Sequence, residues 1–198
     1  MIDLSGYAED LNNFNKDFKR ADNLAQDVKL LTGKEVIPAI IQLRYAGFHI
    51  SEFLLNEDSK YLEKAKSHAK RAVFEAARYG IAFCGEAIKK FQEMYQSEIL
   101  PDTVTKYSEK MLIVQKAKDG VLVDGNEDER ADACESSFYK IKSILVELMA
   151  CQDVLNQRAE EKVRDREQKK KETQRWKIMF FIAVASLVVM VVNVILNA

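Results

Sequence analysis

The chain has 198 residues, a formal net charge of −1, and only 7 Gly and 2 Pro. So few helix-breaking residues favour a small number of long helices and argue against a fold of many short strands. The three cysteines, Cys84, Cys134 and Cys151, include no CxxC pair. An odd, unpatterned set argues against a disulfide framework and a zinc site, so we expect neither a metal nor a cofactor. The acidic first ten residues predict no signal peptide.

Apolar residues near the start of the chain predict a long amphipathic first helix. They follow one another at alternating steps of three and four residues: Leu4, Tyr7, Leu11, Phe14, Phe18, Ala21, Ala25 and Val28. This spacing places them on one face of a helix, as at the a and d positions of a heptad. The helix is expected to end at Thr32 and Gly33, where the glycine suits a C-terminal cap.

A second helix is predicted over residues 36–55, with Pro38 in the first turn, where a proline is tolerated. The apolar residues of this segment lie on nearly every side of a helix: Ile37, Ile40, Ile41, Leu43, Phe48, Ile50, Phe53 and Leu54. A helix that is apolar all round is normally buried. We therefore expect the second helix to be central and covered on more than one face.

Residues 60–98 predict a long third helix, rich in alanine and capped at its start by Asp58 or Ser59. Small side chains let neighbouring helices approach closely. Gly80 and Gly85 lie inside this helix and favour a bend there, since each costs about 1 kcal/mol relative to alanine. Pro101 marks its end, and a shorter fourth helix is predicted over residues 103–118.

A non-helical connector over residues 120–125 precedes the fifth predicted helix, residues 126–155, which Asn126 and Glu129 start as a capping box. Its apolar face again has steps of three and four: Ala131, Cys134, Phe138, Ile141, Leu145, Leu148, Gln152 and Leu155. Residues 156–177 are almost wholly polar, with opposite charges at i,i+4. They predict a solvated helical stalk that continues the fifth helix, and a disordered basic linker is the alternative.

Residues 178–196 are apolar apart from Ser186 and Asn193, and as a helix they reach about 28 Å. We interpret them as a single transmembrane helix. The membrane interface would hold a basic and aromatic group just before it: Lys169, Lys170, Lys171, Arg175, Trp176 and Lys177. Because no basic residue follows the span, the positive-inside rule puts the N-terminal domain in the cytoplasm, and a bacterial inner membrane is favoured.

The sequence therefore predicts an all-α fold in three parts. Residues 1–155 form a cytoplasmic bundle of four to five helices, residues 156–177 a charged juxtamembrane stalk, and residues 178–196 the transmembrane helix. The two seams at 4–28 and 131–155 either pack against each other within one chain or meet partner helices. Periodicity alone does not separate these alternatives.

The only two histidines, His49 and His68, are expected at one level of the hairpin between the second and third helices. The same count places Arg44 level with Arg71. The predicted interhelical polar cluster comprises the following side chains: Arg44, Tyr45, His49, Glu52, His68, Arg71 and Glu75. One interpretation is a catalytic or anion-binding group, because histidine titrates near neutrality and arginine grips phosphate. The other is a hydrogen-bonded layer that fixes helix register.

Arg44 and His49, in the segment RYAGFH, fit the R-x4-H skeleton of HEPN-like helical ribonucleases, and the chain resembles that family in this segment. The resemblance covers at most residues 36–98. It implies a helical bundle that dimerises to bring two such motifs together. It also implies that Arg44 and His49 are the catalytic residues for RNA cleavage.

The sequence contains no Gly-rich phosphate loop, nucleophile elbow or HExxH motif. We therefore expect a membrane-tethered helical interaction or effector module whose bundle binds a helical partner or self-associates. The alternative is a membrane-anchored HEPN-like ribonuclease. Expected partners are the lipid bilayer and either further copies of the chain or another helical protein. DNA is not expected, because the basic block lacks interleaved aromatic residues, and RNA is a partner only under the alternative.

Overall fold

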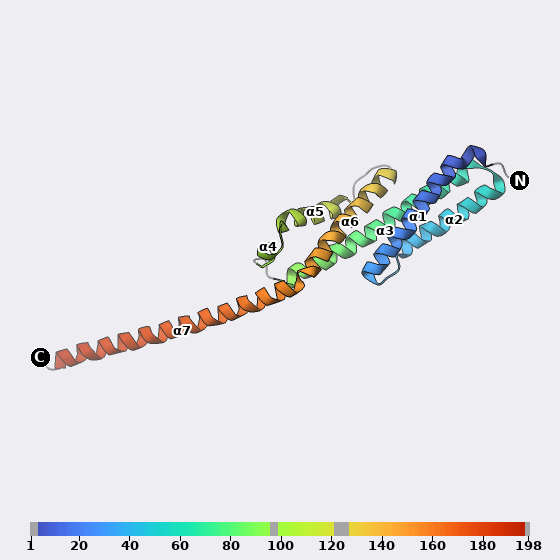
Figure 1. The fold of residues 1–198 in the computed structure, drawn as a ribbon. Coiled ribbons are helices and arrows are strands. Elements are labelled where there is room, and N and C mark those ends of the chain that lie inside the picture. The colour runs from blue at the N-terminus through green and yellow to red at the C-terminus, as the bar shows by residue number, and fades with distance from the viewer. Residues whose placement is uncertain (1–3, 96–98, 121–126, 197–198) are drawn as a thin grey trace. The chain divides into compact units, whose positions relative to one another are not determined.

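The computed structural model describes residues 4–95, 99–120 and 127–196, and the surroundings of their side chains except at 102, 127–128 and 185–196. All regular structure within these residues is helical (Figure 1). The all-α fold class and the helical bundle are therefore confirmed. The chain divides into two compact units, Met1–Cys151 and Gln152–Ala198, which are described separately.

The first unit begins with a short 3-10 helix, η1 (Ser5–Tyr7), followed by α1 (Ala8–Thr32) and α2 (Ile37–Asn56). Gly33 ends α1 as predicted: it takes a left-handed conformation with φ 70°, and its N–H donates to the Lys29 carbonyl at 2.7 Å. Pro38 lies in the first turn of α2, as expected. The predicted apolar face of α1 is turned inward, with Ala21 and Val28 fully buried.

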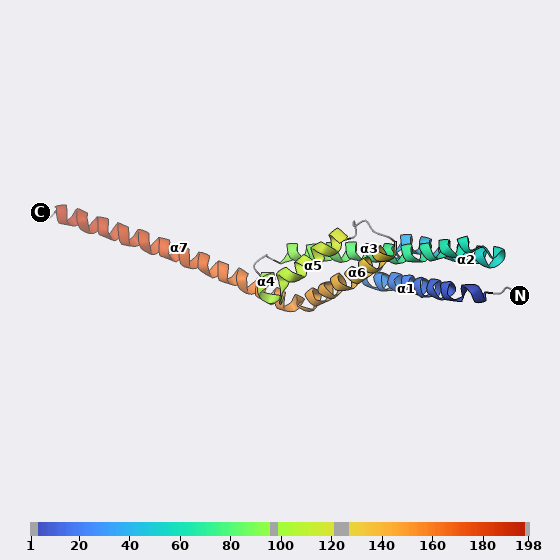
Figure 2. The same cartoon turned by 90° about the horizontal axis from the view of Figure 1, so that it is seen from above.

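The longest helix of this unit is α3 (Ser59–Met94), which is continuous through both of its internal glycines. Asp58 caps its start by accepting a hydrogen bond from the Lys60 backbone N–H at 3.0 Å. The helices α1, α2 and α6 all pack on α3 (Figures 1 and 2). Its buried alanines make this possible, because small side chains leave room for a neighbour on several sides: Ala65, Ala69, Ala72, Ala76 and Ala77.

The central helix is thus α3, and the prediction that α2 is central was wrong. One side of α2 does face the interior, with Ala39, Ala46 and Phe53 buried. Several of its large apolar residues are exposed instead: Ile37, Ile41, Phe48, Leu54 and Leu55. The sequence correctly indicated that α2 is rich in apolar residues. It did not indicate which side of α2 the neighbouring helices cover.

The remaining helices of this unit are α4 (Ile99–Thr103), α5 (Tyr107–Gly120) and α6 (Glu127–Ala150). The apolar seam predicted for the fifth helix is the buried face of α6, from Ala131 to Leu148. The short α4 was not predicted. The connector at 121–125 and the expected cap at Asn126 lie outside the described residues.

The predicted unbroken helix through the stalk was wrong, because the structure divides it at Cys151 into α6 and α7 (Gln152–Leu196). The Cys151 N–H is shared between the carbonyls of Glu147 at 3.1 Å and Leu148 at 3.2 Å. Such a shared bond tightens the last turn of a helix toward 3-10 geometry.

The second unit is α7, in which residues 156–177 are helical throughout and largely exposed. No helix in the described part of the chain combines the length and apolar character that crossing a bilayer requires. The expected transmembrane helix at 178–196 is therefore not supported, and neither is the single-pass localisation with a cytoplasmic N-terminal domain.

Candidate functional site

The outward face of α2 carries a stripe of large apolar side chains, which we call the α2 stripe: Ile37, Ile41, Tyr45, Phe48 and Leu55. They lie within an arc of about 80° on a helical wheel. Phe48 is 57% exposed, Ile37 56% and Leu55 78%. Ile37, Ile41, Tyr45 and Phe48 follow one another along this face, and Leu55 lies two turns beyond Phe48.

The middle of the α2 stripe is hollowed. Ile41, Arg44, Tyr45 and Phe48 line a recess of about 460 Å³ on this face. Arg44 is exposed, and no ion-pair partner is found for it within the described part of the chain. The surface therefore combines apolar area with a positive charge at one edge.

The two histidines lie together beneath this face, between α2 and α3. The rings of His49 and His68 are stacked, with centroids 5.2 Å apart and planes 16° from parallel. Tyr45 covers the His68 ring at 5.3 Å, and Tyr61 covers the His49 ring at 6.2 Å. His68 Nδ1 is 2.7 Å from Gln42 Oε1, which fixes the orientation of that ring.

His49 differs from His68 in its hydrogen bonding. Its Nδ1 atom is buried and has no hydrogen-bond partner among the described residues. Arg44, the other half of the R-x4-H skeleton, lies in the exposed recess, whereas His49 is half-buried between aromatic rings. His49 is not among the residues that line the recess with Arg44.

Two acidic members of the predicted polar cluster have partners on their own helices. Glu52 accepts a hydrogen bond from the Asn56 side chain at 3.2 Å on the same helix. Glu75 pairs with Arg78, one turn further along α3, at 2.6 Å. Of the predicted cluster, His49, His68 and Tyr45 thus form a ring stack, and Glu52 and Glu75 are each paired with a residue of the same helix.

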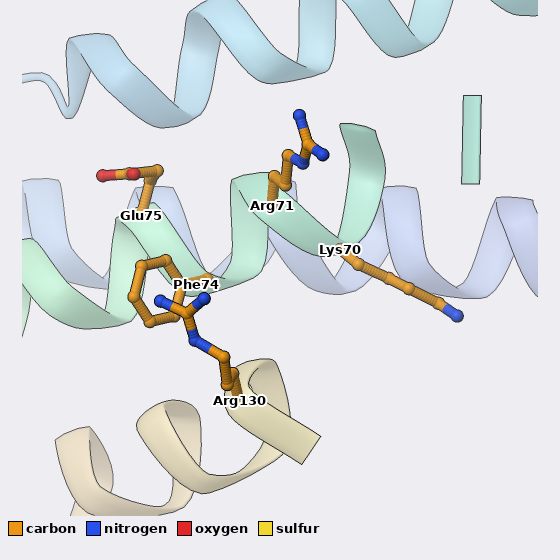
Figure 3. Close-up of a pocket in the computed structure, with 5 residues that line it drawn as sticks. All are labelled: Lys70, Arg71, Phe74, Glu75 and Arg130. Atoms are coloured by element: carbon orange, nitrogen blue, oxygen red, sulfur yellow. The ribbon is translucent and has the colours of Figure 1, made fainter. Parts of the chain in front are cut away.

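Arg71 and Glu75 line a second recess, of about 290 Å³, together with Lys70, Phe74 and Arg130. Figure 3 shows Arg130 reaching from α6 to the Phe74 ring on α3, where its guanidinium carbon is 4.7 Å from the ring centroid. This cation–π contact joins the two helices. Sequence reasoning missed it, because Phe74 and Arg130 meet only through the long-range packing of α6 on α3.

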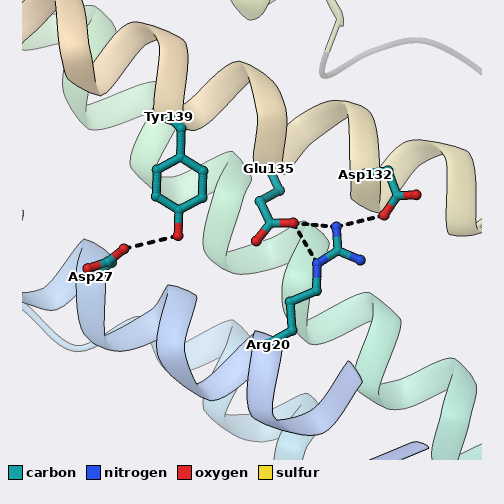
Figure 4. A network of polar contacts seen from close by, with 5 residues as sticks. All are labelled: Arg20, Asp27, Asp132, Glu135 and Tyr139. Carbon is teal, nitrogen blue, oxygen red and sulfur yellow. Dashed lines mark hydrogen bonds and ion pairs between the residues drawn. The ribbon is translucent and has the colours of Figure 1, made fainter. Parts of the chain in front are cut away.

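A polar network joins α1 to α6 (Figure 4). Arg20 binds Glu135, and its Nη2 is 2.6 Å from Asp132 Oδ1. Burial lowers the pKa of Arg20, but the hydrogen bonds to Glu135 and Asp132 outweigh burial and raise the pKa above its ordinary value. Tyr139 donates to Asp27 Oδ2 at 3.0 Å. Each of these side chains thus has a partner across the contact between α1 and α6.

The residues predicted for a membrane interface lie exposed along α7: Lys169, Lys170, Lys171, Arg175, Trp176 and Lys177. Thr173 donates its hydroxyl to the Lys169 carbonyl at 2.8 Å, a bond within the helix. These side chains form a solvated, positively charged segment of the second unit.

No family model, curated protein or solved structure matches this chain.

Proposed function

We propose that this chain is a helical interaction module, and that the α2 stripe is its binding surface for the apolar face of another helix. The observation that supports this proposal is the exposure of the stripe. One apolar face of α2 is covered by α3, whereas the other, which carries the stripe, is exposed. Large contiguous apolar patches of this kind mark protein interfaces in folded domains.

The spacing of the stripe suits a helix as the partner. Ile37, Ile41, Tyr45 and Phe48 follow at i, i+4, i+8 and i+11, the pattern by which one helix packs into the grooves of another. Covering a half-exposed large apolar side chain is worth about 1 kcal/mol, so five of them supply several kcal/mol toward association. Aromatic residues at the centre of the stripe match the composition of interface hot spots.

The test is photo-crosslinking in cells with the full chain, carrying a photoreactive residue in place of Phe48. The matched control carries the same residue in place of Leu30, which is 84% exposed on α1 and lies off the stripe. We expect a discrete crosslinked protein adduct at position 48 and none at position 30. Absence of an adduct at 48, or equal yields at both positions, would contradict the proposal.

A HEPN-like ribonuclease is the second hypothesis, and it stays a prediction. It draws support from one feature, the buried and unpartnered Nδ1 of His49. Cleavage would require Arg44 and His49 to reach one phosphodiester. The Arg44→Ala/His49→Ala variant tests this hypothesis. If the chain is a ribonuclease, the variant loses RNA cleavage but keeps its helicity. If the histidine pair is structural, wild type shows no cleavage and the variant is less stable.

A further inference from the structure

We propose that the partner of the α2 stripe is a second copy of this chain, with its α2 packed antiparallel on the first and the two-fold axis at Phe48. This inference rests on the proposed function and names its partner. It follows from a symmetry in the residues of the stripe and from the charge at its edges.

Part of the outward face of α2 is self-complementary about Phe48, namely the pairs 41/55 and 44/52 and Phe48 itself. In an antiparallel pair centred there, residue i lies level with residue 96 − i of the other copy, because 48 is paired with itself. Ile41 then faces Leu55 of the second copy, and Arg44 faces Glu52. A two-fold interface has this property: the same patch serves both copies, and each contact occurs twice.

The charged residues beside the α2 stripe favour antiparallel packing of the two copies. Arg44 and Glu52 lie two turns apart, on either side of Phe48. Antiparallel packing gives two Arg44–Glu52 pairs between the copies. Parallel packing would place Arg44 against Arg44 and Glu52 against Glu52, and like charges in contact disfavour an interface.

Both charges are available for such pairs. Arg44 is exposed at the rim of the recess that Ile41, Tyr45 and Phe48 complete. Glu52 is half-buried and accepts one hydrogen bond, from Asn56, which leaves lone pairs of the carboxylate open to a guanidinium. The pairing of Ile41 with Leu55 and of Arg44 with Glu52 favours a second copy as the partner, because a two-fold interface uses each contact twice.

The experiment is a charge exchange in the full chain, with the dimer dissociation constant measured by sedimentation. The variants are Arg44→Glu, Glu52→Arg, and the double exchange Arg44→Glu/Glu52→Arg. Each single exchange creates two like-charge pairs across the two-fold axis and should weaken the homodimer by at least about tenfold. The double exchange restores both pairs and should return the constant to within about threefold of wild type.

Mixing the two single variants gives a second, stricter result. One copy then carries two acidic groups and the other two basic groups, so the heterodimer has both pairs restored. The mixture should dimerise like wild type although neither component does alone. Arg44 is exposed and Glu52 half-buried, so unchanged helicity of each variant is the check that it folds.

Single exchanges that leave the dissociation constant unchanged would overturn the inference, as would a full chain that stays monomeric at high concentration. An oligomer that persists in the Phe48→Glu variant would also overturn it, because the assembly would then use another surface. The crosslinking experiment separates the two levels of the proposal. An adduct at position 48 with a different protein leaves the interaction module standing and overturns the self-pairing, and no adduct overturns both.

Discussion

The ring of Phe138 lies against the backbone of Gly80, so that α6 meets α3 at this level with no side chain of residue 80 between them. A Cβ atom at position 80 would overlap the Phe138 ring and come within 3.0 Å of Val28 Cγ2. Phe138 is itself fully buried. The glycine is therefore required by close packing of the two helices.

Gly80→Ala should destabilise the chain despite the better helix propensity of alanine. Overpacking at a buried contact costs about 1–3 kcal/mol, which exceeds the gain of about 1 kcal/mol from propensity. Gly85→Ala is the matched control, because its Cβ would meet only the flexible end of the Lys118 side chain. We expect that variant to be neutral or slightly more stable. Urea unfolding followed by circular dichroism measures both, and equal effects would contradict the packing argument.

The ion pairs of Arg20 should differ in their contribution to stability. Glu135 is 20% exposed and Asp132 69%. A partly buried charged hydrogen bond is worth about 1–2 kcal/mol, whereas an exposed ion pair contributes about 0.5 kcal/mol or less. Glu135→Gln should therefore lower the free energy of unfolding more than Asp132→Asn. A reversed order would show that Asp132 is the main partner.

Because Tyr139 keeps its proton in the folded chain, the free energy of unfolding should fall at alkaline pH. Burial and the hydrogen bond to Asp27 raise the pKa of Tyr139 from 10.0 to about 12. Between these values the unfolded phenol ionises while the folded one keeps its proton, so unfolding releases a proton and rising pH favours the unfolded chain. Tyr139→Phe should cost about 1 kcal/mol at neutral pH through the lost hydrogen bond. This difference from wild type should shrink as the pH rises from 10 toward 12.

The measurement is the free energy of unfolding of wild type and Tyr139→Phe at several alkaline pH values. Asp27→Asn is a second variant, since it removes the negative charge that helps hold the phenol protonated. A constant difference between wild type and Tyr139→Phe across this range would mean that the phenol titrates alike in both states.

The three cysteines should react with thiol reagents at different rates. Burial raises the pKa of the Cys84 thiol to about 11. At about pH 8 its thiolate fraction is then reduced about a hundredfold, on top of poor access. Burial also raises the pKa of Cys134, while Cys151 is only half-buried. Mass spectrometry of the labelled native chain should find Cys151 modified first, and all three modified after unfolding. Early labelling of Cys84 would contradict its placement in the core.

Much of the fold was predictable because local rules determine it. The predicted seam of α6 is buried from Ala131 to Leu148, and that of α1 is buried at Ala21 and Val28 and half-buried at its other positions, because packing of an amphipathic helix follows its apolar face. Gly33 and Asp58 act as caps because backbone conformation and a side-chain acceptor are local properties. The small residues of α3 could also be seen in the sequence. Their consequence, that α1, α2 and α6 pack on α3, was not predicted.

The rest depends on relations between distant segments. An apolar helix is expected to be central, but composition does not state which neighbour covers it, so the exposure of α2 was not predicted. The contact between Phe74 and Arg130 joins residues on α3 and α6 that no periodicity relates. The stripe itself was readable, since Ile37, Ile41, Tyr45 and Phe48 share one spacing. The spacing could not indicate that α3 packs on the opposite side of α2 and leaves this stripe exposed.

The arrangement of helices around α3 also bears on the order in which the first unit assembles. The contacts between α2 and α3 join neighbours across a short turn at Glu57 and Asp58, so closing this hairpin costs little chain entropy. The packing of α6 on α3 must instead close a long loop that contains α4 and α5. We expect the hairpin to gain structure early and α6 to dock last. A chain emerging from the ribosome would therefore present the α2 stripe before its bundle is complete, early enough for two nascent copies to meet.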